Sequence, residues 1–277
     1  MTAVRRLLNE PGVPPHEAER LLAVATGRSR RELLAEAAEV GAQEAQCYMD
    51  LIRRRLSGVP LQHLEETVQF GPIEVRSDRR ALVPRPETER LWEEAVAALG
   101  EAGPGTVIVD LCTGSGNLAL ALQHRFPQAR VYGSDLASDA LALAEENAAA
   151  LGLGVTFLRG DLFEPLPGEL YERVDLLVAN PPYLADSEFD RLPIDVREHD
   201  PRQALVAGPR GDEVMSRIAA DAYWWMGTGG WLFCEIGETQ SDRALELFGP
   251  YLDVEVRPDL AGRPRILVGR KGGRCCV

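Results

Sequence analysis

Two short loops carry the residues whose types and spacing could do chemistry. One of them, Asn180-Pro181-Pro182-Tyr183, follows an apolar run, and its two prolines fix two φ angles and remove two backbone donors. The loop therefore presents two acceptors on a rigid backbone, the side-chain oxygen of Asn180 and the carbonyl oxygen of Pro181. A planar NH2 group has two hydrogens that fit these acceptors, and Tyr183 can cover its plane. The alternative is a plain turn that ends a strand.

Two acceptors around one NH2 group suit the transfer of a methyl group to nitrogen. An amide nitrogen is a poor nucleophile because its lone pair is delocalised into the carbonyl group. Holding both N–H groups positions the nitrogen in line with an electrophilic methyl group, favours its pyramidalisation and stabilises the positive charge that develops on it. Such a transfer needs no strong general base, and neither histidine nor lysine stands beside the loop in the sequence.

The other loop runs from Asp110 to Ala119 and has glycines at positions 114 and 116. Glycine lets the backbone turn tightly and approach a ligand closely at the N-terminus of the next helix. The same pattern opens dinucleotide-binding folds, and it also occurs as a tight turn without a ligand. Asp110 favours S-adenosylmethionine over a dinucleotide, because a carboxylate suits the cationic amino group of that cofactor and repels a pyrophosphate.

Two further acids extend the predicted cofactor site. Asp135 ends the second predicted strand, nineteen residues after Gly116, where an acid can accept both ribose hydroxyls of either cofactor. Asp161 follows the third strand and can meet the adenine amino group while Leu162 covers the ring. The alternative for Asp161 is a structural role as the cap of the next turn.

Alternating strands and helices must position both loops. Short apolar strands separated by helices indicate a parallel, doubly wound sheet from Thr106 onward. The strands are predicted at residues 107–109, 130–133, 155–158, 174–178, 231–236, 252–256 and 265–268. The helices are predicted at residues 91–99, 117–124, 138–151, 213–226 and 241–248.

The first 62 residues are predicted to form a small helical module. Ser29 and Glu32 have the spacing of a capping box, and a longer helix is predicted over residues 42–55. Apolar residues follow the capping box at helical period: Leu33, Leu34, Ala37 and Ala38. Arg53, Arg54 and Arg55 are interpreted as a solvated helix end, with a partner-binding surface as the alternative.

A hairpin pattern separates this module from the sheet. Residues 67–70 and 73–75 alternate in polarity around Gly71-Pro72, as strands of a hairpin do. The chain is predicted to have three parts: a helical domain over residues 1–62, a connecting β-hairpin over residues 63–86 and a domain over residues 87–277 that contains both loops. We expect substrate recognition in the first part and catalysis in the last.

The composition and net charge of the chain restrict the kinds of partner that it can bind. The 277 residues carry a net charge of −13, and residues 1–60 hold nine arginines and eight acids, so the remainder carries −14. Proteins that grip duplex nucleic acid normally present a basic face, so the charge disfavours direct nucleic-acid binding and suits a basic protein partner. Of the five cysteines, three are isolated and two are adjacent at positions 275 and 276; none has zinc-ligand spacing, and the set predicts neither disulfides nor a metal site. No membrane span and no secretory signal are predicted, so we expect a cytoplasmic location.

A resemblance to a known family covers both loops. From about Arg53 to Arg270 the chain resembles the release-factor glutamine methyltransferases, the PrmC/HemK family. Asp110 to Gly116 is similar to the cofactor loop of that family, and Asn180 to Tyr183 matches its acceptor motif. Further positions fall into the family pattern: Pro84–Glu89, Glu198, Pro201, Ala204, Leu205, Gly208, Gly211 and Asp259–Arg265.

The resemblance implies an α/β fold, that of a Rossmann-like class I S-adenosylmethionine-dependent methyltransferase. Its sheet would be seven-stranded and mostly parallel with an antiparallel last strand, and it would carry a small all-α N-terminal domain and a connecting β-hairpin. The implied reaction transfers a methyl group from S-adenosylmethionine to the N5 side-chain amide of the glutamine in the Gly-Gly-Gln motif of class I peptide chain release factors. S-adenosylhomocysteine would be the product.

The resemblance also implies site residues. Cofactor contacts carry over to Cys112, Thr113, Gly114, Ser115, Gly116, Asp135, Leu162 and Asn180, which join Asp110 and Asp161 in the predicted cofactor site. Catalytic roles carry over to Asn180, Pro181 and Tyr183, and substrate contacts to Asn180, Pro181, Pro182 and Tyr183.

The chain departs from the family pattern in three places. Cys112 stands where the family commonly has glycine, which crowds the cofactor loop slightly. Leu64-Glu65-Glu66 replaces the usual Leu-Thr-Gly before the hairpin, which affects the connection between the domains. Leu162 stands where some members carry an aromatic residue.

Four other functions remain as alternatives. An adenine-N6 methyltransferase uses similar acceptor loops, but it must flip a base and hold a phosphate backbone, which the acidic chain disfavours. A related enzyme modifies a glutamine of a ribosomal protein, and the segment Pro84–Glu89 favours the release factor instead. A nicotinamide-dependent dehydrogenase would leave Asn180–Tyr183 without a role. A non-catalytic binding module would not need both loops intact.

Overall fold

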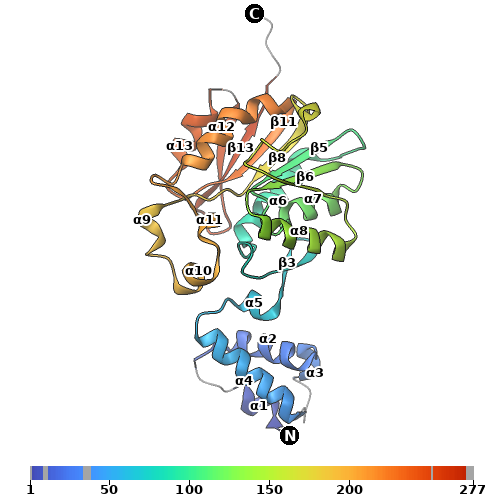
Figure 1. Ribbon diagram of the computed structural model, residues 1–277, viewed down its shortest axis with the longest axis vertical. Helices are drawn as coiled ribbons and strands as arrows, with labels where there is room; N and C mark the ends of the chain where they lie inside the picture. The colour runs from blue at the N-terminus through green and yellow to red at the C-terminus, as the bar shows by residue number, and fades with distance from the viewer. Residues whose placement is uncertain (1, 9–11, 34–38, 251, 273–277) are drawn as a thin grey trace, which may run out of the picture. The chain divides into compact units, whose positions relative to one another are not determined.

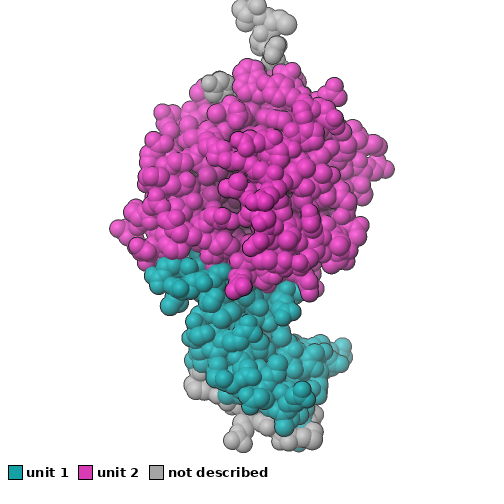
Figure 2. All heavy atoms as spheres, in the orientation of Figure 1, with its two compact units in different colours: residues 1–68, 193–199 teal, residues 69–192, 200–277 magenta. Residues whose placement is uncertain are grey.

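The computed structural model describes residues 2–8, 12–33, 39–250 and 252–272. The chain divides into two compact units, coloured separately in Figure 2: unit 1 comprises residues 1–68 and 193–199, and unit 2 comprises residues 69–192 and 200–277. The three-part division with boundaries at residues 62 and 86 stays a prediction. Within the described ranges, no helix is both long enough and apolar enough to cross a membrane.

Unit 1 consists of short helices around an apolar core. Its helices are α1 (Val4–Leu7), α2 (Pro15–Thr26), α3 (Arg30–Leu33), α4 (Ala42–Leu56), α5 (Leu61–Glu65) and α10 (Ile194–His199), with one pair of two-residue strands, β1 (Thr2–Ala3) and β2 (Glu39–Val40). α2 begins at Pro15, whose fixed φ suits the first helical position, and Gly27 caps its C-terminal end with a φ of 65°. Leu21 and Leu22 on α2 and Tyr48 on α4 are fully buried in the core.

The local signals in the first 62 residues are confirmed where the structure describes them. The backbone N–H of Ser29 donates to Oε2 of Glu32 at 2.8 Å, and the N–H of Glu32 donates to Oγ of Ser29 at 3.3 Å, so the capping box forms. The helix predicted over residues 42–55 is α4. The remaining helical positions predicted after the capping box, Leu34, Ala37 and Ala38, lie outside the described residues.

The basic end of α4 is partly engaged inside unit 1. Arg55 donates to both carboxylate oxygens of Glu17 on α2, at 2.6 and 3.1 Å, and this hydrogen bonding lowers the pKa of Glu17. Arg53 forms an ion pair with Asp50, one helical turn earlier. The interpretation of this cluster as a solvated helix end is therefore wrong for Arg55, which ties α4 to α2.

Seven strands form the main sheet of unit 2 in the order β12-β13-β11-β8-β5-β6-β7 (Figure 1). They are β5 (Val107–Leu111), β6 (Arg130–Asp135), β7 (Thr156–Arg159), β8 (Val174–Ala179), β11 (Met226–Glu235), β12 (Asp253–Pro258) and β13 (Pro264–Arg270). From β11 to β7 all neighbours are parallel, whereas β13 is antiparallel to both β11 and β12. The predicted seven-stranded, mostly parallel sheet with an antiparallel last strand is confirmed.

Helices cover both faces of this sheet, which explains why its central strands are almost entirely apolar. α6 (Pro86–Leu99) packs against α7 (Asn117–Arg125), and α8 (Ser138–Leu151) lies on the same side of the sheet in Figure 1. α12 (Glu213–Trp225) and α13 (Ser241–Phe248) pack against each other on the opposite side.

Two elements begin several residues earlier than the sequence predicts. α6 starts at Pro86 rather than near Leu91, because Pro86 occupies the first turn of the helix, where a missing N–H costs nothing. β11 starts at Met226 rather than at Trp231, and the register between β11 and β8 shifts between these two residues. The hairpin is confirmed as β3 (Thr67–Phe70) and β4 (Ile73–Arg76), with a φ of 50° at Gly71.

Several elements have no counterpart in the sequence prediction. β9 (Leu184–Ala185) pairs in parallel with β10 (Val206–Gly208), and the short helices α9 (Asp186–Phe189) and α11 (Arg202–Leu205) lie between them in the sequence. A 3-10 turn, η1 (Gly168–Leu170), precedes β8. Elements of two to four residues are too short to show a recognisable helical or strand periodicity in the sequence.

Candidate active site

A cavity of about 290 Å³ lies at the carboxyl ends of β5, β6 and β8. The sheet register pairs Leu111 with Ser134 on β6 and with Ala179 on β8. The residues that follow these three strand positions, Cys112, Asp135 and Asn180, therefore meet at one edge of the sheet and line the cavity. Ligands bind at this edge in open parallel sheets.

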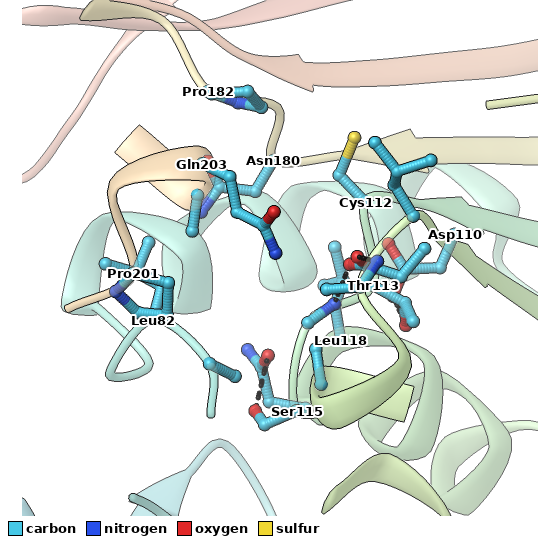
Figure 3. Close-up of a pocket in the computed structure, with 18 of the residues that line it drawn as sticks. Leu82, Asp110, Cys112, Thr113, Ser115, Leu118, Asn180, Pro182, Pro201 and Gln203 are labelled. Atoms are coloured by element: carbon cyan, nitrogen blue, oxygen red, sulfur yellow. Dashed lines mark hydrogen bonds between the residues drawn. The ribbon is translucent and has the colours of Figure 1, made fainter. Parts of the chain in front are cut away.

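Most of the predicted site residues line this cavity. They are Asp110, Cys112, Thr113, Gly114, Ser115, Asp135, Asp161, Leu162, Asn180 and Pro182. Among the described residues, Gly116, Pro181 and Tyr183 do not line it. Figure 3 shows Asn180, Pro201 and Gln203 on one side of the cavity and Asp110, Cys112 and Thr113 on the other.

The glycine loop contributes through backbone conformation and close packing. Gly114 and Gly116 have φ angles of 55° and 78°, in the left-handed region that favours glycine. A Cβ atom on Gly116 would lie 2.9 Å from Cζ of Phe157 and 3.0 Å from Cβ of Ala144, so a side chain there would clash. Gly116 therefore acts by letting the start of α7 pack closely against Phe157 of β7 and Ala144 of α8.

Cys112 adopts a left-handed conformation as well, with a φ of 58°. This conformation costs a non-glycine residue roughly 1–2 kcal/mol, which explains why a glycine would suit the position. The side chain packs against the core of the sheet, and burial raises the pKa of its thiol. The departure from the family pattern at Cys112 is thus accommodated with backbone strain.

Asp110 is a buried carboxyl group at the end of β5, with 1% of its surface exposed. Its Oδ2 accepts hydrogen bonds from Oγ1 of Thr113 at 2.6 Å and from the backbone N–H of Ala119 at 3.1 Å. Burial raises its pKa to about 7, against the opposing effect of these two donors. A cationic group in the cavity would stabilise the ionised form of Asp110.

Asp135 is held by the backbone rather than by side chains. The N–H of Gly114 donates to its Oδ2 and the N–H of Ala137 donates to its Oδ1, both at 2.9 Å. Burial nevertheless raises its pKa. Each carboxylate oxygen has lone pairs left after these bonds, so the group can still accept hydrogen bonds from two hydroxyls of a ligand.

Asp161 and Leu162 border the cavity after β7. Asp161 forms an ion pair with Arg217 on α12 at 2.7 Å, and Arg217 also lines the cavity. The carbonyl oxygen of Leu162 accepts a hydrogen bond from Oγ of Ser134 at 2.8 Å, and Leu162 has a φ of 51°. This bond fixes the backbone that presents the Leu162 side chain to the cavity.

The side-chain amide of Asn180 is oriented by two residues that the sequence analysis did not single out. Its Nδ2 donates to Oγ1 of Thr88 on α6 at 2.9 Å, and Oγ1 of Thr88 donates to Oε2 of Glu235 at 2.7 Å. Thr88 lies inside the segment Pro84–Glu89, to which no role was given. The sequence feature that could have indicated Glu235 is the position of an acid at the end of an otherwise apolar strand.

Tyr183 lies beside a second cavity, of about 690 Å³, lined in part by Arg191, Arg210 and Arg265. The guanidinium of Arg265 lies 5.6 Å from the centre of the Tyr183 ring. Burial raises the pKa of Tyr183 to about 12, so its hydroxyl stays protonated at neutral pH. Nε2 of Gln240 donates to the Tyr183 carbonyl oxygen at 3.0 Å and fixes the end of the loop.

The far wall of the first cavity is formed by two segments, residues 80–85 and 201–206, which the predicted site did not include. An ion pair of 2.6 Å between Arg85 and the fully buried side chain of Asp200 ties these segments together. Gln203 also lines this wall, and Figure 3 shows its side chain directed into the cavity.

The residues of the cavity fit S-adenosylmethionine. Asp110 offers a buried carboxylate for a cationic amino group, and Asp135 offers an acceptor for hydroxyls. Leu162 and Leu118 offer apolar surface for a flat ring. A pyrophosphate would instead meet the negative charges of Asp110 and Asp135, which repel it.

Comparisons with known proteins agree with this geometry. Residues 1–64 match the PrmC N-terminal domain, and residues 108–193 match the Methyltransferase domain. The chain is 40% identical to a release factor glutamine methyltransferase of Deinococcus radiodurans, over 99% of this chain and 98% of that protein. It is 42% identical to a release factor glutamine methyltransferase of Mycobacterium tuberculosis, over 82% of this chain and 75% of that protein.

A solved structure shares the fold. The T. thermophilus 16S rRNA N2 G1207 methyltransferase (RsmC), in complex with AdoMet and guanosine, matches with a TM-score of 0.54 at 20% identity. The match covers 74% of this chain and 49% of that chain, and it concerns the fold alone.

The sheet order, the cavity at its carboxyl edge and the matched Methyltransferase domain define a class I S-adenosylmethionine-dependent methyltransferase. The 40% identity to the Deinococcus radiodurans enzyme, over nearly the full length of both chains, then decides the family within this class. The chain belongs to the release factor glutamine methyltransferases, which are protein-(glutamine-N5) methyltransferases. This membership excludes the alternative of a nicotinamide-dependent dehydrogenase.

Proposed function

We propose that this chain transfers the methyl group of S-adenosylmethionine to the N5 atom of the glutamine in the Gly-Gly-Gln motif of class I peptide chain release factors. The observation that carries the proposal is the hydrogen bond that holds Nδ2 of Asn180 on Thr88 beside the cavity. This bond directs the other end of the amide, Oδ1, away from Thr88, where it can accept a hydrogen bond from a substrate N–H group. The similarity to two release factor glutamine methyltransferases supports the release factor as the substrate.

Cofactor binding is assigned to the acids and the glycine loop. Asp110 would bind the amino group of the methionine part, and Asp135 would accept hydrogen bonds from the ribose hydroxyls. Asp161 would accept a hydrogen bond from the adenine amino group while Leu162 covers the ring. The remaining contacts would come from Cys112, Thr113, Gly114, Ser115 and Asn180. Bound S-adenosylmethionine supplies a methyl group on a sulfonium, which is the electrophile of the reaction.

The acceptor loop is assigned to the glutamine side chain. Oδ1 of Asn180 and the carbonyl oxygen of Pro181 would each accept one hydrogen of the carboxamide and aim its nitrogen at the methyl group. The same two acceptors stabilise the positive charge that develops on the nitrogen, and the extra proton then leaves to water. Pro182 keeps the loop rigid, and the neutral ring of Tyr183 would cover the plane of the carboxamide.

Charge supports a protein substrate over a nucleic acid. Residues beyond the first 60 carry a net charge of −14, which repels a phosphate backbone and attracts basic protein surfaces. We therefore propose no direct nucleic-acid contact, and we place the reaction in the cytoplasm, where peptide release takes place.

The test is incubation of the enzyme with labelled S-adenosylmethionine and purified class I release factors, followed by mass mapping. We expect one methyl group on the glutamine of the Gly-Gly-Gln motif. Ribosomal proteins and adenine-containing DNA and RNA form parallel arms of the experiment. Label on a ribosomal protein or on a nucleic acid, with none on the release factors, would contradict the proposed substrate and identify another.

A further inference from the structure

Three side chains from three separate elements form one chain of hydrogen bonds behind the acceptor loop. Asn180 follows β8, Thr88 lies in the first turn of α6, and Glu235 ends β11. The distances are 2.9 Å from Asn180 to Thr88 and 2.7 Å from Thr88 to Glu235. Thr88 and Glu235 are each 2% exposed, so water does not compete for these bonds.

The number of available hydrogens determines which group donates and which accepts in each of these hydrogen bonds. An ionised carboxylate can only accept, so the single hydrogen of the Thr88 hydroxyl points at Glu235. The hydroxyl can then only accept from Asn180, and only the NH2 end of the Asn180 amide can donate to it. The oxygen end of the amide must consequently face the other way.

We infer that Thr88 and Glu235 are positioning residues that fix which end of the Asn180 amide faces the substrate carboxamide. The inference rests on the proposed function, because it concerns how Asn180 receives the N–H group of a glutamine. Without the Thr88 hydroxyl the amide of Asn180 is free to rotate by half a turn. Its NH2 group would then meet the NH2 group of the substrate, and neither could accept a hydrogen bond from the other.

Burial and the charged groups around Glu235 determine the pH range in which it is ionised, and therefore the range in which the Thr88 hydroxyl must donate to it. Thr88 donates a hydrogen bond to Glu235, and the ionisable groups close enough to interact with it are Arg265, Arg85, Glu87, Tyr183 and Cys234. The two arginines favour the carboxylate and Glu87 disfavours it, while burial has the largest effect and raises the pKa of Glu235 to about 7. Tyr183 and Cys234 stay neutral near pH 7, because burial raises the pKa of each.

Protonation of Glu235 would therefore remove the constraint on Thr88. A protonated carboxyl can donate to the Thr88 hydroxyl, whose own hydrogen is then free to point at the oxygen of Asn180. Because the constraint requires the carboxylate, the rate of methyl transfer should be highest above the pKa of Glu235. It should fall as the pH decreases through about 7.

The first test compares Thr88→Val with Thr88→Ser. Valine has nearly the shape of threonine but no hydroxyl, so we expect kcat to fall by about ten- to a thousandfold while the Kd for S-adenosylhomocysteine stays within about twofold of the wild type. Serine restores the hydroxyl and should restore most of kcat. Thr106→Val serves as the matched control, because Thr106 bonds to the N–H of Gly103 away from the cavity and should leave kcat unchanged.

The second test measures kcat against pH for Glu235→Gln. Glutamine cannot become a carboxylate, so the rise in kcat through about pH 7 should disappear and the plateau should be lower. Glu255→Gln, at an exposed position of β12, should keep the wild-type profile. Normal melting temperature and cofactor Kd establish that each variant is folded.

The results separate this inference from the proposed function. A wild-type enzyme that does not methylate release factors contradicts the proposed function. An active wild type together with an equally active Thr88→Val, or a Glu235→Gln enzyme with the wild-type pH profile, overturns the inference.

Discussion

The hydroxyl of Thr113 donates a 2.6 Å hydrogen bond to the carboxylate of Asp110, inside the turn that joins β5 to α7. This bond occupies Oδ2, which also accepts from the N–H of Ala119, so Oδ1 is the oxygen left for a ligand. Burial holds the pKa of Asp110 at about 7 in the protein without ligand, so the charge of this group changes close to neutral pH.

We predict that S-adenosylmethionine binds more weakly as the pH falls. Its cationic amino group favours ionised Asp110, and below pH 7 a growing fraction of this carboxyl is protonated in the free protein. The affinity should therefore be lost as the pH decreases through about 7, with Kd rising about ten- to thirtyfold between pH 7.5 and pH 5.5. Calorimetric titration at several pH values measures this directly.

Asp110→Asn supplies the matched variant for that titration. It keeps the size of the side chain and removes its charge, so the Kd at pH 7.5 should rise by about ten- to a hundredfold and lose its pH dependence. Asp253→Asn, on an exposed position of β12, should behave like the wild type. A pH-dependent Kd that survives in Asp110→Asn would place the titrating group elsewhere.

Asn180→Ala should separate catalysis from cofactor binding. The variant loses an acceptor that is needed most in the transition state, so we expect kcat on a folded release factor to fall by about one to three orders of magnitude. The Kd for the cofactor should stay close to that of the wild type. Single-turnover measurements with saturating cofactor give the rate of the chemical step, and an unchanged rate would refute the assignment of Asn180.

Gly116→Ala should destabilise the catalytic unit strongly. The residue combines a φ of 78° with neighbours 2.9 and 3.0 Å from the position of a new Cβ, so we expect a loss of about 2–4 kcal/mol in the free energy of unfolding. Gly152→Ala is the matched control, because Gly152 has a φ of 66° and open space around it.

The contrast between these two glycines isolates the effect of packing. Gly152→Ala should lose only about 1–2 kcal/mol, the cost of the backbone conformation alone. Urea denaturation of both variants measures the difference, and equal losses would show that the contact of Gly116 with Phe157 does not matter.

Removal of residues 1–60 should affect a protein substrate more than a peptide. If the helical domain binds the release factor, KM for the whole factor should rise by roughly tenfold or more, which corresponds to ~1.4 kcal/mol of binding free energy. KM for a short peptide that contains Gly-Gly-Gln should change little, because the peptide reaches only the acceptor loop. An unchanged cofactor Kd controls for folding, and equal effects on both substrates would argue against substrate recognition by this domain.

Local patterns in the sequence were sufficient to predict most of the sheet and several residues of the site. Short runs of three to six residues marked the strands of the sheet, and α8 begins and ends at the predicted residues, Ser138 and Leu151. Asp110, Asp135 and Asn180 were recognised because each lies at the end of an apolar strand, and parallel strands present their carboxyl ends at one edge. These features depend on neighbours within a few positions, so the sequence alone reveals them.

Contacts between distant positions were decided by the tertiary structure alone. Thr88, Asn180 and Glu235 are brought together because α6 covers the sheet where β8 and β11 lie side by side, an order that no local pattern encodes. Residues 193–199 join unit 1 although they lie between two segments of unit 2. A hydrogen-bond partner or a buried charge becomes visible only when the chain has folded, because both depend on which remote elements pack together.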